Sequence, residues 1–200
     1  MFVVIFEVQP KAASWDAYLS HAAALKPELE RIDGFLHNER FRSRKRDGWL
    51  VSLSAWHDEK ALVRWRAHGA HHAVQADGRA TVFQDYRLRV GESVDAATPA
   101  RCDLTAIGAA KAALLAEGPD AALDAAPPPH GAVDWDRFDS IPNPGQGLLL
   151  SFWRDVAAAG AAPCPAGCRC RVVAILRDYG MFDRAEAPQY HPPVPAPPRV

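Results

Sequence analysis

The sequence predicts an α+β protein made of two copies of one unit, each with the order strand, helix, strand, strand, helix, strand. Two observations lead to this prediction. The stretch from Asn38 to Trp56 recurs in the second half from Trp135 to Trp153. In the first half, the spacing of hydrophobic residues changes between strand and helix periods in the stated order. This order is the ferredoxin-like, or split βαβ, plan.

The repeat is carried by identical residues at a fixed distance. Six pairs are each 97 residues apart: Arg40–Arg137, Phe41–Phe138, Ser43–Ser140, Ser54–Ser151, Trp56–Trp153 and Asp58–Asp155. An Asp-Tyr dipeptide also recurs, with Asp85 and Asp178 93 residues apart. The pattern predicts a tandem duplication with domains at 1–96 and 97–186, followed by a Pro-rich tail at 187–200 that extends along the surface.

Each element of the first half has its own signal. The β-branched and aromatic residues 2–8 predict a strand. Ser14 and Gly34 frame a helix whose apolar residues recur at helical spacing. Asp47-Gly48 predicts a hairpin turn between strands 35–41 and 49–56. Asp58 caps a second helix over 59–76, and a strand at 80–90 completes the unit.

The second half repeats this order with weaker signals. Residues 101–108 stand where its first strand belongs, and the alanine-rich stretch 109–126 predicts a helix interrupted by Gly118-Pro119. A turn at 143–145, a strand ending at Trp153, a short helix at 155–160 and a strand at 170–178 follow. A sheet with helices on one face needs cover on the other. We therefore expect the two units to pack sheet to sheet as a pseudo-dimer within one chain, with further homodimerisation through free strand edges left open.

Composition limits the partners and the compartment. A net charge of −1 and a pI near 6.7 give no electrostatic reason to expect nucleic acid or an anionic membrane as partner. No apolar run reaches the ~18 residues that span a bilayer, and the first ten residues predict a strand rather than a signal peptide. We expect a soluble cytoplasmic protein. The spacing of Cys164, Cys168 and Cys170 differs from zinc knuckles, which favours reduced thiols over a metal site.

The stretches GFLHNERFRS, WLVSLSAWHDEKALVRWRAHGAHHAVQADGR and FQDYRLRV resemble the antibiotic biosynthesis monooxygenase (ABM) family of dimeric α+β barrels over residues 2–90. The second half resembles a degenerate copy of the same domain. The resemblance implies an α+β barrel, which the duplicated chain would form as a pseudo-dimer. The second half lacks most of the second helix, including counterparts of Trp65 and the histidines, so we expect one functional half. The resemblance also implies oxidation of a small aromatic phenol or quinol by dioxygen, without metal or flavin.

The candidate catalytic residues are Trp65, His68 and His72 on the second helix and Asn38 and Arg40 on the second strand. With Gln75, the helical residues fall on one stripe, and Glu7 was expected to point into the same space. A histidine could act as the base that removes a phenolic proton, and Arg40 could stabilise the phenolate that forms. Asn38 or Trp65 could donate a hydrogen bond to a developing oxyanion. His71 beside the stripe is expected to be solvated.

Other interpretations stay open. Trp65 and Trp56 are also typical of core packing, and Arg40, which recurs as Arg137, is also typical of a structural ion pair. His68 and His72 have the spacing of a metal pair, but no third ligand is apparent. Haem degradation is disfavoured, because the family's haem branch implies Asn and His where this chain has Glu7 and Gln75. A non-enzymatic small-molecule-binding barrel, and a scaffold whose tail contacts a partner protein, are the alternatives.

Overall fold

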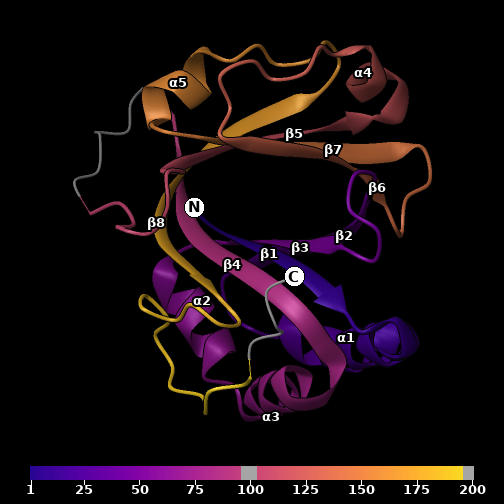
Figure 1. Ribbon diagram of the computed structural model, residues 1–200, viewed down its shortest axis with the longest axis vertical. Helices are drawn as coiled ribbons and strands as arrows, with labels where there is room; N and C mark the ends of the chain where they lie inside the picture. The colour runs from indigo at the N-terminus through magenta and orange to yellow at the C-terminus, as the bar shows by residue number, and fades with distance from the viewer. Residues whose placement is uncertain (96–102, 196–200) are drawn as a thin grey trace.

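The strands form one closed barrel in which neighbouring strands are antiparallel (Figure 1). The computed structural model describes residues 1–95 and 103–195. Around the wall the order is β1-β3-β2-β6-β7-β5-β8-β4. The strands are β1 (Phe2–Pro10), β2 (Phe35–Ser43), β3 (Leu50–Trp56), β4 (Phe83–Val94), β5 (Ala112–Pro119), β6 (Asp134–Ser140), β7 (Gln146–Trp153) and β8 (Arg169–Gly180).

Both halves of the wall have the same internal order, β4-β1-β3-β2 in the first and β8-β5-β7-β6 in the second. They join at two seams, where β4 pairs with β8 over eight residue pairs and β2 with β6 over three. The predicted fold class, two split-βαβ units packed as a pseudo-dimeric α+β barrel, is confirmed. Every described strand has a neighbour on both sides, but β2 and β6 pair only over Phe41–Ser43 and Phe138–Ser140, so further homodimerisation stays a prediction.

Successive side chains along each strand point to opposite faces of the barrel wall, which gives an inner and an outer core. Side chains of both halves meet inside the barrel, among them Val3, Ile5, Val51, Leu53, Leu115, Phe138, Leu150 and Ile175. The alternate residues of β1 and β3, including Val4 and Trp56, point outward and pack against Leu62 and Trp65. The outer face of the first sheet is therefore available to carry a site.

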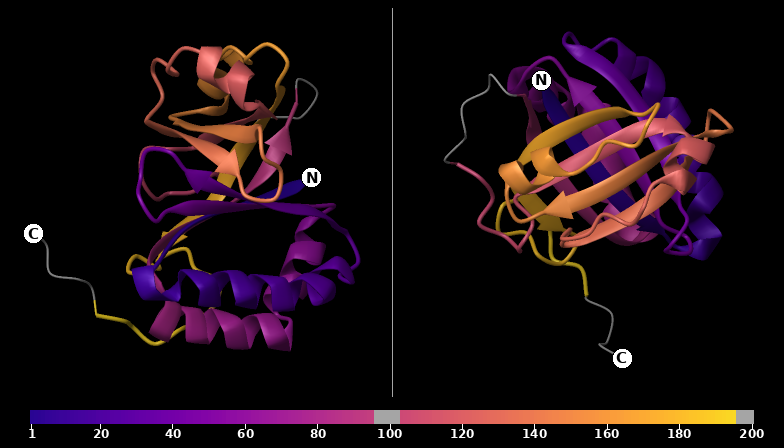
Figure 2. Two further views of the ribbon diagram at one scale, coloured as in Figure 1. Left: turned by 90° about the vertical axis from the view of Figure 1, so that its right-hand side faces the viewer. Right: turned by 90° about the horizontal axis from the view of Figure 1, so that it is seen from above.

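Helices cover the outside of the two halves unequally (Figure 2). The first half carries α1 (Trp15–Glu30), α2 (Glu59–Arg66) and α3 (Gly69–Asp77), with short turns η1 (Ala12–Ser14) and η2 (Gly78–Val82). The second half carries only α4 (Asp120–Ala125) and α5 (Val156–Ala161) within the described residues. No helix in those residues is long and apolar enough to cross a membrane.

The second helix of the first half differs from the prediction. In place of one helix over 59–76, the chain forms α2 and α3 with a break at Ala67 and His68. His68 has an extended backbone (φ −65°, ψ 128°) and precedes Gly69, a poor helix former. The stretch Gly78–Val82 then adds a π-helical turn, so the fourth strand starts at Phe83 rather than at residue 80.

The alanine-rich stretch of the second half also differs. The predicted helix over 109–126 is β5 followed by α4, while residues 103–111 contain no strand, and 101–102 lie outside the described residues. Residues Ala112 to Ala116 are buried between β7 and β8. Small side chains fit a strand covered on both faces, so tertiary packing overrides the helix propensity of alanine.

The prediction of reduced thiols is wrong for two cysteines. Cys164 and Cys170 form a disulfide, whereas Cys168 is free and Cys102 lies outside the described residues. Structural disulfides persist mainly in oxidising compartments. The cytoplasmic location therefore stays a prediction.

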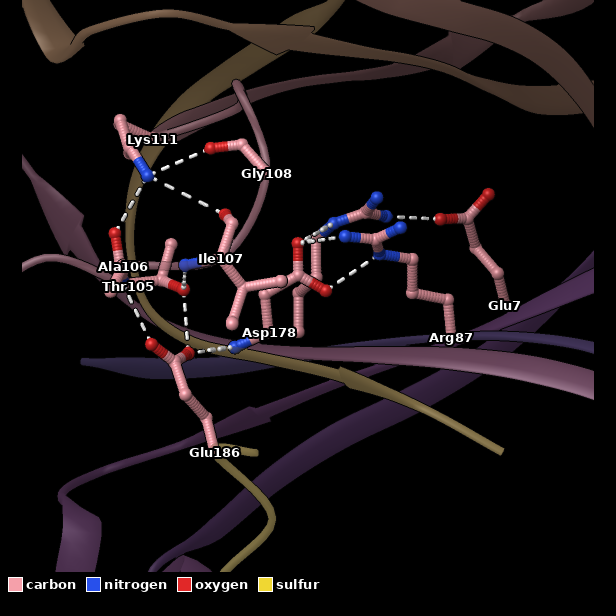
Figure 3. Close-up of polar contacts among 10 residues, drawn as sticks. Glu7, Arg87, Thr105, Ala106, Ile107, Gly108, Lys111, Asp178 and Glu186 are labelled. Atoms are coloured by element: carbon pink, nitrogen blue, oxygen red, sulfur yellow. Dashed lines mark hydrogen bonds and ion pairs between the residues drawn. The ribbon is translucent and has the colours of Figure 1, made fainter. Parts of the chain in front are cut away.

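Charged residues close one part of the barrel interior. Asp178 on β8 accepts hydrogen bonds from Arg87 Nε (2.7 Å) and Nη2 (2.9 Å) and from Arg89 Nε (3.1 Å), and Arg89 also pairs with Glu7 (Figure 3). Arg46 donates to the same Glu7 at 2.6 Å. Glu7 therefore lies on the inner face of β1 with Val3 and Ile5, not in the outer space that the sequence suggested.

The ion network predicts a large cost for removing Asp178, which is 1% exposed. The Asp178→Ala variant leaves Arg89 buried without one of its two carboxylates. We expect its free energy of unfolding, measured by urea denaturation, to fall by about 3–5 kcal/mol. Glu30→Ala, which removes an exposed ion pair with Lys26, is the matched control and should change it by less than about 1 kcal/mol. Equal effects of the two substitutions would contradict a structural role for the network.

Candidate functional site

A cavity of about 200 Å³ lies between the outer face of the first-half sheet and the helices that cover it. Val4 and Phe6 of β1, with Leu88 and Val90 of β4, supply an apolar floor. Leu25 and Leu29 of α1, Leu62 and Trp65 of α2 and Val74 of α3 supply apolar walls. The cavity therefore suits a ligand that is mostly apolar.

The polar lining of this cavity has one sign of charge. Four arginines line it: Arg40, Arg66, Arg79 and Arg184. No Asp or Glu is among the described lining residues, and no described carboxylate forms an ion pair with any of the four. Positive charge in an apolar cavity attracts and orients an anion.

Trp65 and His71 form one wall of the cavity. Their rings stack with centroids 4.3 Å apart and 16° between planes. His71 Nδ1 lies 3.1 Å from the Trp65 carbonyl oxygen, which can only accept, so Nδ1 carries the proton and Nε2 the lone pair. Burial lowers the pKa of His71 to about 4, so the ring is neutral at neutral pH. The expectation that His71 is solvated is wrong.

Two strand residues reach the cavity from β2. Asn38 donates from Nδ2 to Ser52 Oγ (2.9 Å) and to the Leu53 carbonyl (3.0 Å), so its amide oxygen is the group left for a ligand. Arg40 faces Tyr18: burial raises the pKa of the Tyr18 hydroxyl, and the Arg40 charge opposes that rise. Arg40 Nε is buried without a hydrogen-bond partner. Arg40 makes no structural ion pair with a described carboxylate, so that alternative is wrong.

The structure brings together three of the five predicted site residues. Trp65, Asn38 and Arg40 line the cavity, whereas His68 and His72 do not. The break between α2 and α3 ends the stripe on which the prediction depended. His68 lies 3.9 Å from Glu28 instead, and the exposed His72 stacks on His191 with centroids 5.6 Å apart.

Several lining residues were missed because they come from unexpected segments. Arg79 lies in the π-helical turn, and Arg184, Pro188, Gln189 and His191 lie after the last strand. The described part of the C-terminal tail was expected only to extend along the surface, but it closes this cavity. Tyr86 could have been noticed, since its Asp-Tyr dipeptide recurs in the second half.

A second cavity of about 640 Å³ lies over β5 and β7. Its floor occupies equivalent register positions: Leu114 pairs with Ser151 as Val4 pairs with Ser54. Its roof consists of alanines and prolines of the α4 and α5 segments, and His130 is its one ionisable side chain besides Cys164, which is held in the disulfide, among the described residues. The two cavities thus lie over equivalent strand positions of the two halves but differ in the charge of their linings.

No group of three or more described His, Cys, Asp or Glu residues is arranged to hold a metal ion.

The chain is similar to proteins described as monooxygenases. The family model described as antibiotic biosynthesis monooxygenase matches residues 1–77. A protein of Pyricularia oryzae named "Jasmonate monooxygenase ABM" is 41% identical over 218 residues, covering 96% of this chain and 99% of that protein. A crystal structure of an antibiotic biosynthesis monooxygenase is 22% identical, with a TM-score of 0.43, over 48% of this chain and 100% of its own. A putative monooxygenase from Lactobacillus acidophilus is 9% identical, with a TM-score of 0.42, over 88% of this chain and 94% of its own.

The lowered pKa of the partly buried His71 predicts a specific pH dependence of stability. In the unfolded chain its pKa returns toward 6.5, so the unfolded state takes up the proton first as the pH falls. As the pH falls from 6.5 to about 4, the free energy of unfolding of the wild type should therefore decrease. The His71→Gln variant should lack this decrease. The NMR titration of the His71 ring and urea midpoints at several pH values measure this. His57→Gln, at an exposed position, is the control, and a His71 ring that titrates near pH 6.5 would contradict the burial.

Proposed function

The chain belongs to the antibiotic biosynthesis monooxygenase family, and from this membership we propose that it is a monooxygenase acting on a small, mostly apolar molecule that carries an acidic group. One observation supports the substrate class best. The apolar cavity over the first sheet has four arginines and no described carboxylate in its lining. A neutral ligand would leave these charges, among them the buried Arg79, without a counter-ion from the described residues.

We propose a carboxylate of the size of jasmonate as the first candidate. The relative that matches over nearly its full length is named for jasmonate, which is a carboxylate with a cyclopentanone ring and an apolar side chain. Arginine side chains in the cavity lining would bind the carboxylate, and the apolar floor would contact the remainder of the molecule. Hydroxylation of such a molecule converts a C–H bond and dioxygen, with two electrons and two protons, into C–OH and water. An external two-electron donor is therefore part of this candidate.

An aromatic phenol or quinol is the second candidate, as the family resemblance implied. This substrate supplies the electrons itself, so the reaction with dioxygen needs neither metal nor flavin. The neutral His71 favours this candidate, because the lone pair on Nε2 can accept a hydrogen bond from a phenolic hydroxyl beside Trp65. Arg40 would stabilise the phenolate. In both candidates we assign the site to Trp65, His71, Asn38 and Arg40, and we no longer include His68 and His72.

We also propose that the chain arose by tandem duplication, with units at 1–96 and 97–186 and a tail at 187–200. The equal strand order of the two halves supports this proposal. The second unit would then supply the other wall of the barrel, as a second subunit does in a dimer. The boundary at 96–97 and residues 196–200 lie outside the described residues.

Blocking the cavity tests the function directly. Ala22 of α1 lines the cavity, whereas the neighbouring Ala23 is exposed and does not line it. We expect Ala22→Trp to abolish product formation and ligand binding, because the indole fills the space, while Ala23→Trp keeps both. Oxygen uptake and mass spectrometry of products are measured with jasmonate plus a reductant, and with a panel of anthrones and dihydroxy-aromatics without one.

The outcomes separate the candidates. Product from jasmonate that requires the reductant supports the first candidate, and product from an aromatic without reductant supports the second. Tight binding without oxygen uptake in either arm would contradict an enzyme and favour the binding-protein alternative. Activity that survives in Ala22→Trp would place the reaction outside this cavity.

A further inference from the structure

Two arginines converge on one tyrosine hydroxyl at the end of the cavity. Tyr86 Oη accepts hydrogen bonds from Arg79 Nη1 at 2.5 Å and from Arg184 Nη1 at 2.7 Å. These two bonds use both lone pairs of the hydroxyl oxygen. The Tyr86 O–H is thus left to donate, and it has no acceptor among the described side chains and carbonyls. The cluster offers hydrogen-bond donors and no acceptor.

No carboxylate of the described residues balances the charge of this cluster. Arg79 is 5% exposed, and its Nη2 is buried without a hydrogen-bond partner. Its Nη1 makes one further bond, to the Met181 carbonyl at 3.2 Å. In the barrel interior, by contrast, Arg89 contacts two carboxylates. A buried guanidinium without a counter-ion is costly, which indicates that an anion from outside the chain completes the cluster.

Local structure holds Arg79 in this position. It lies in the π-helical turn Gly78–Val82, and such turns occur often at functional sites. A Cβ atom at Gly78 would lie 2.5 Å from the Phe83 ring, so the turn packs here only with glycine. The ring of Phe83 in turn packs edge-on against Tyr86, with centroids 6.0 Å apart. The turn and the strand that follows it therefore fix Arg79 relative to Tyr86.

Arg184 is fixed by the segment after β8. Glu186 accepts hydrogen bonds from Thr105 Oγ1 (2.5 Å) and from the backbone N–H of Ala106 and Asp178, both at 2.7 Å (Figure 3). On its other side, Arg184 Nη2 donates to the Gln189 carbonyl at 2.8 Å, and Gln189 Nε2 donates to the Arg66 carbonyl at 3.3 Å. The segment is anchored at both ends and carries Arg184 over the cavity.

We propose that Arg79, Tyr86 and Arg184 form the seat of the substrate's acidic group, a carboxylate, so that the C-terminal segment is part of the binding site. The inference rests on the proposed function and deepens it by naming the residues that select the acid. Arg79 Nη2 and the Tyr86 hydroxyl donate to the carboxylate, and Arg184 supplies the second positive charge. The remainder of the ligand then extends over the apolar floor toward Trp65. Arg40, on β2, holds no part of the carboxylate.

Binding of an acid and its methyl ester tests the seat, because the ester keeps the shape and removes the charge. Calorimetry with jasmonate and methyl jasmonate, and with phenylacetate and its methyl ester, gives Kd values for wild type and variants. We expect wild type to prefer each acid. In Arg184→Gln and Tyr86→Phe, Kd for the acid should rise about 10- to 100-fold while Kd for the ester changes less than about threefold. Arg79→Gln should also raise Kd for the acid alone. If Arg79→Gln does not fold, Arg184→Gln, at a partly exposed position, provides the test.

Arg177→Gln is the matched control, since Arg177 pairs with Glu59 outside the cavity, and it should leave both Kd values unchanged. The proposed seat would be overturned if Arg184→Gln and Tyr86→Phe kept the wild-type preference for the acid over its ester. It would also be overturned if only Arg40→Gln lost this preference. If wild type binds phenylacetate but not jasmonate, the proposed substrate fails and the seat is judged on phenylacetate. If wild type prefers neither acid to its ester, the seat itself is overturned.

Discussion

The barrel depends on a charge network that its two halves share. Inside the wall, three carboxylates and three guanidinium groups meet: Glu7, Asp136, Asp178, Arg46, Arg87 and Arg89. Each half contributes members, so a half on its own would bury charges without partners. At the shorter seam Arg44 adds ion pairs to Asp120, Asp124 and Asp139. Because the penalty for an unpaired buried charge is large, the network favours this pairing of sheets and this register over alternatives.

Filling the interior in this way moves ligand binding to the outer faces. Apolar side chains and the ion network occupy the space between the sheets, and both cavities lie between a sheet and the segments that cover it. Equivalent strand positions form the two floors, but the covers differ. The α2 helix, the π-helical turn and the C-terminal segment bring Arg66, Arg79 and Arg184 to the first cavity, and β2 brings Arg40. Short helices and proline loops bring no arginine to the second cavity among the described residues. The covers, rather than the barrel, therefore decide which half can select an acid.

The sequence predicted the barrel more completely than the site. Strand alternation and the matched residues determine local structure and strand order, so the first half and the pairing of sheets followed from them. Two errors came from propensity: alanines that suit a helix form the buried strand β5, and the helix over 59–76 breaks at His68. The break removed His68 and His72 from the cavity and placed His71 in it. Arg79 and Arg184 could not be found, because a π-helical turn and a segment after the last strand have no periodic signal that predicts where they lie.

The central claim is that the first cavity binds a small carboxylate with its acidic group between Arg79, Tyr86 and Arg184. A crystal structure of the protein with jasmonate tests this claim most directly. The account predicts carboxylate oxygens within hydrogen-bond distance of Arg79 Nη2 and Tyr86 Oη, with the apolar part over Val4 and Trp65. Ligand density over β5 and β7, or a carboxylate that points to solvent away from Arg184, would contradict it.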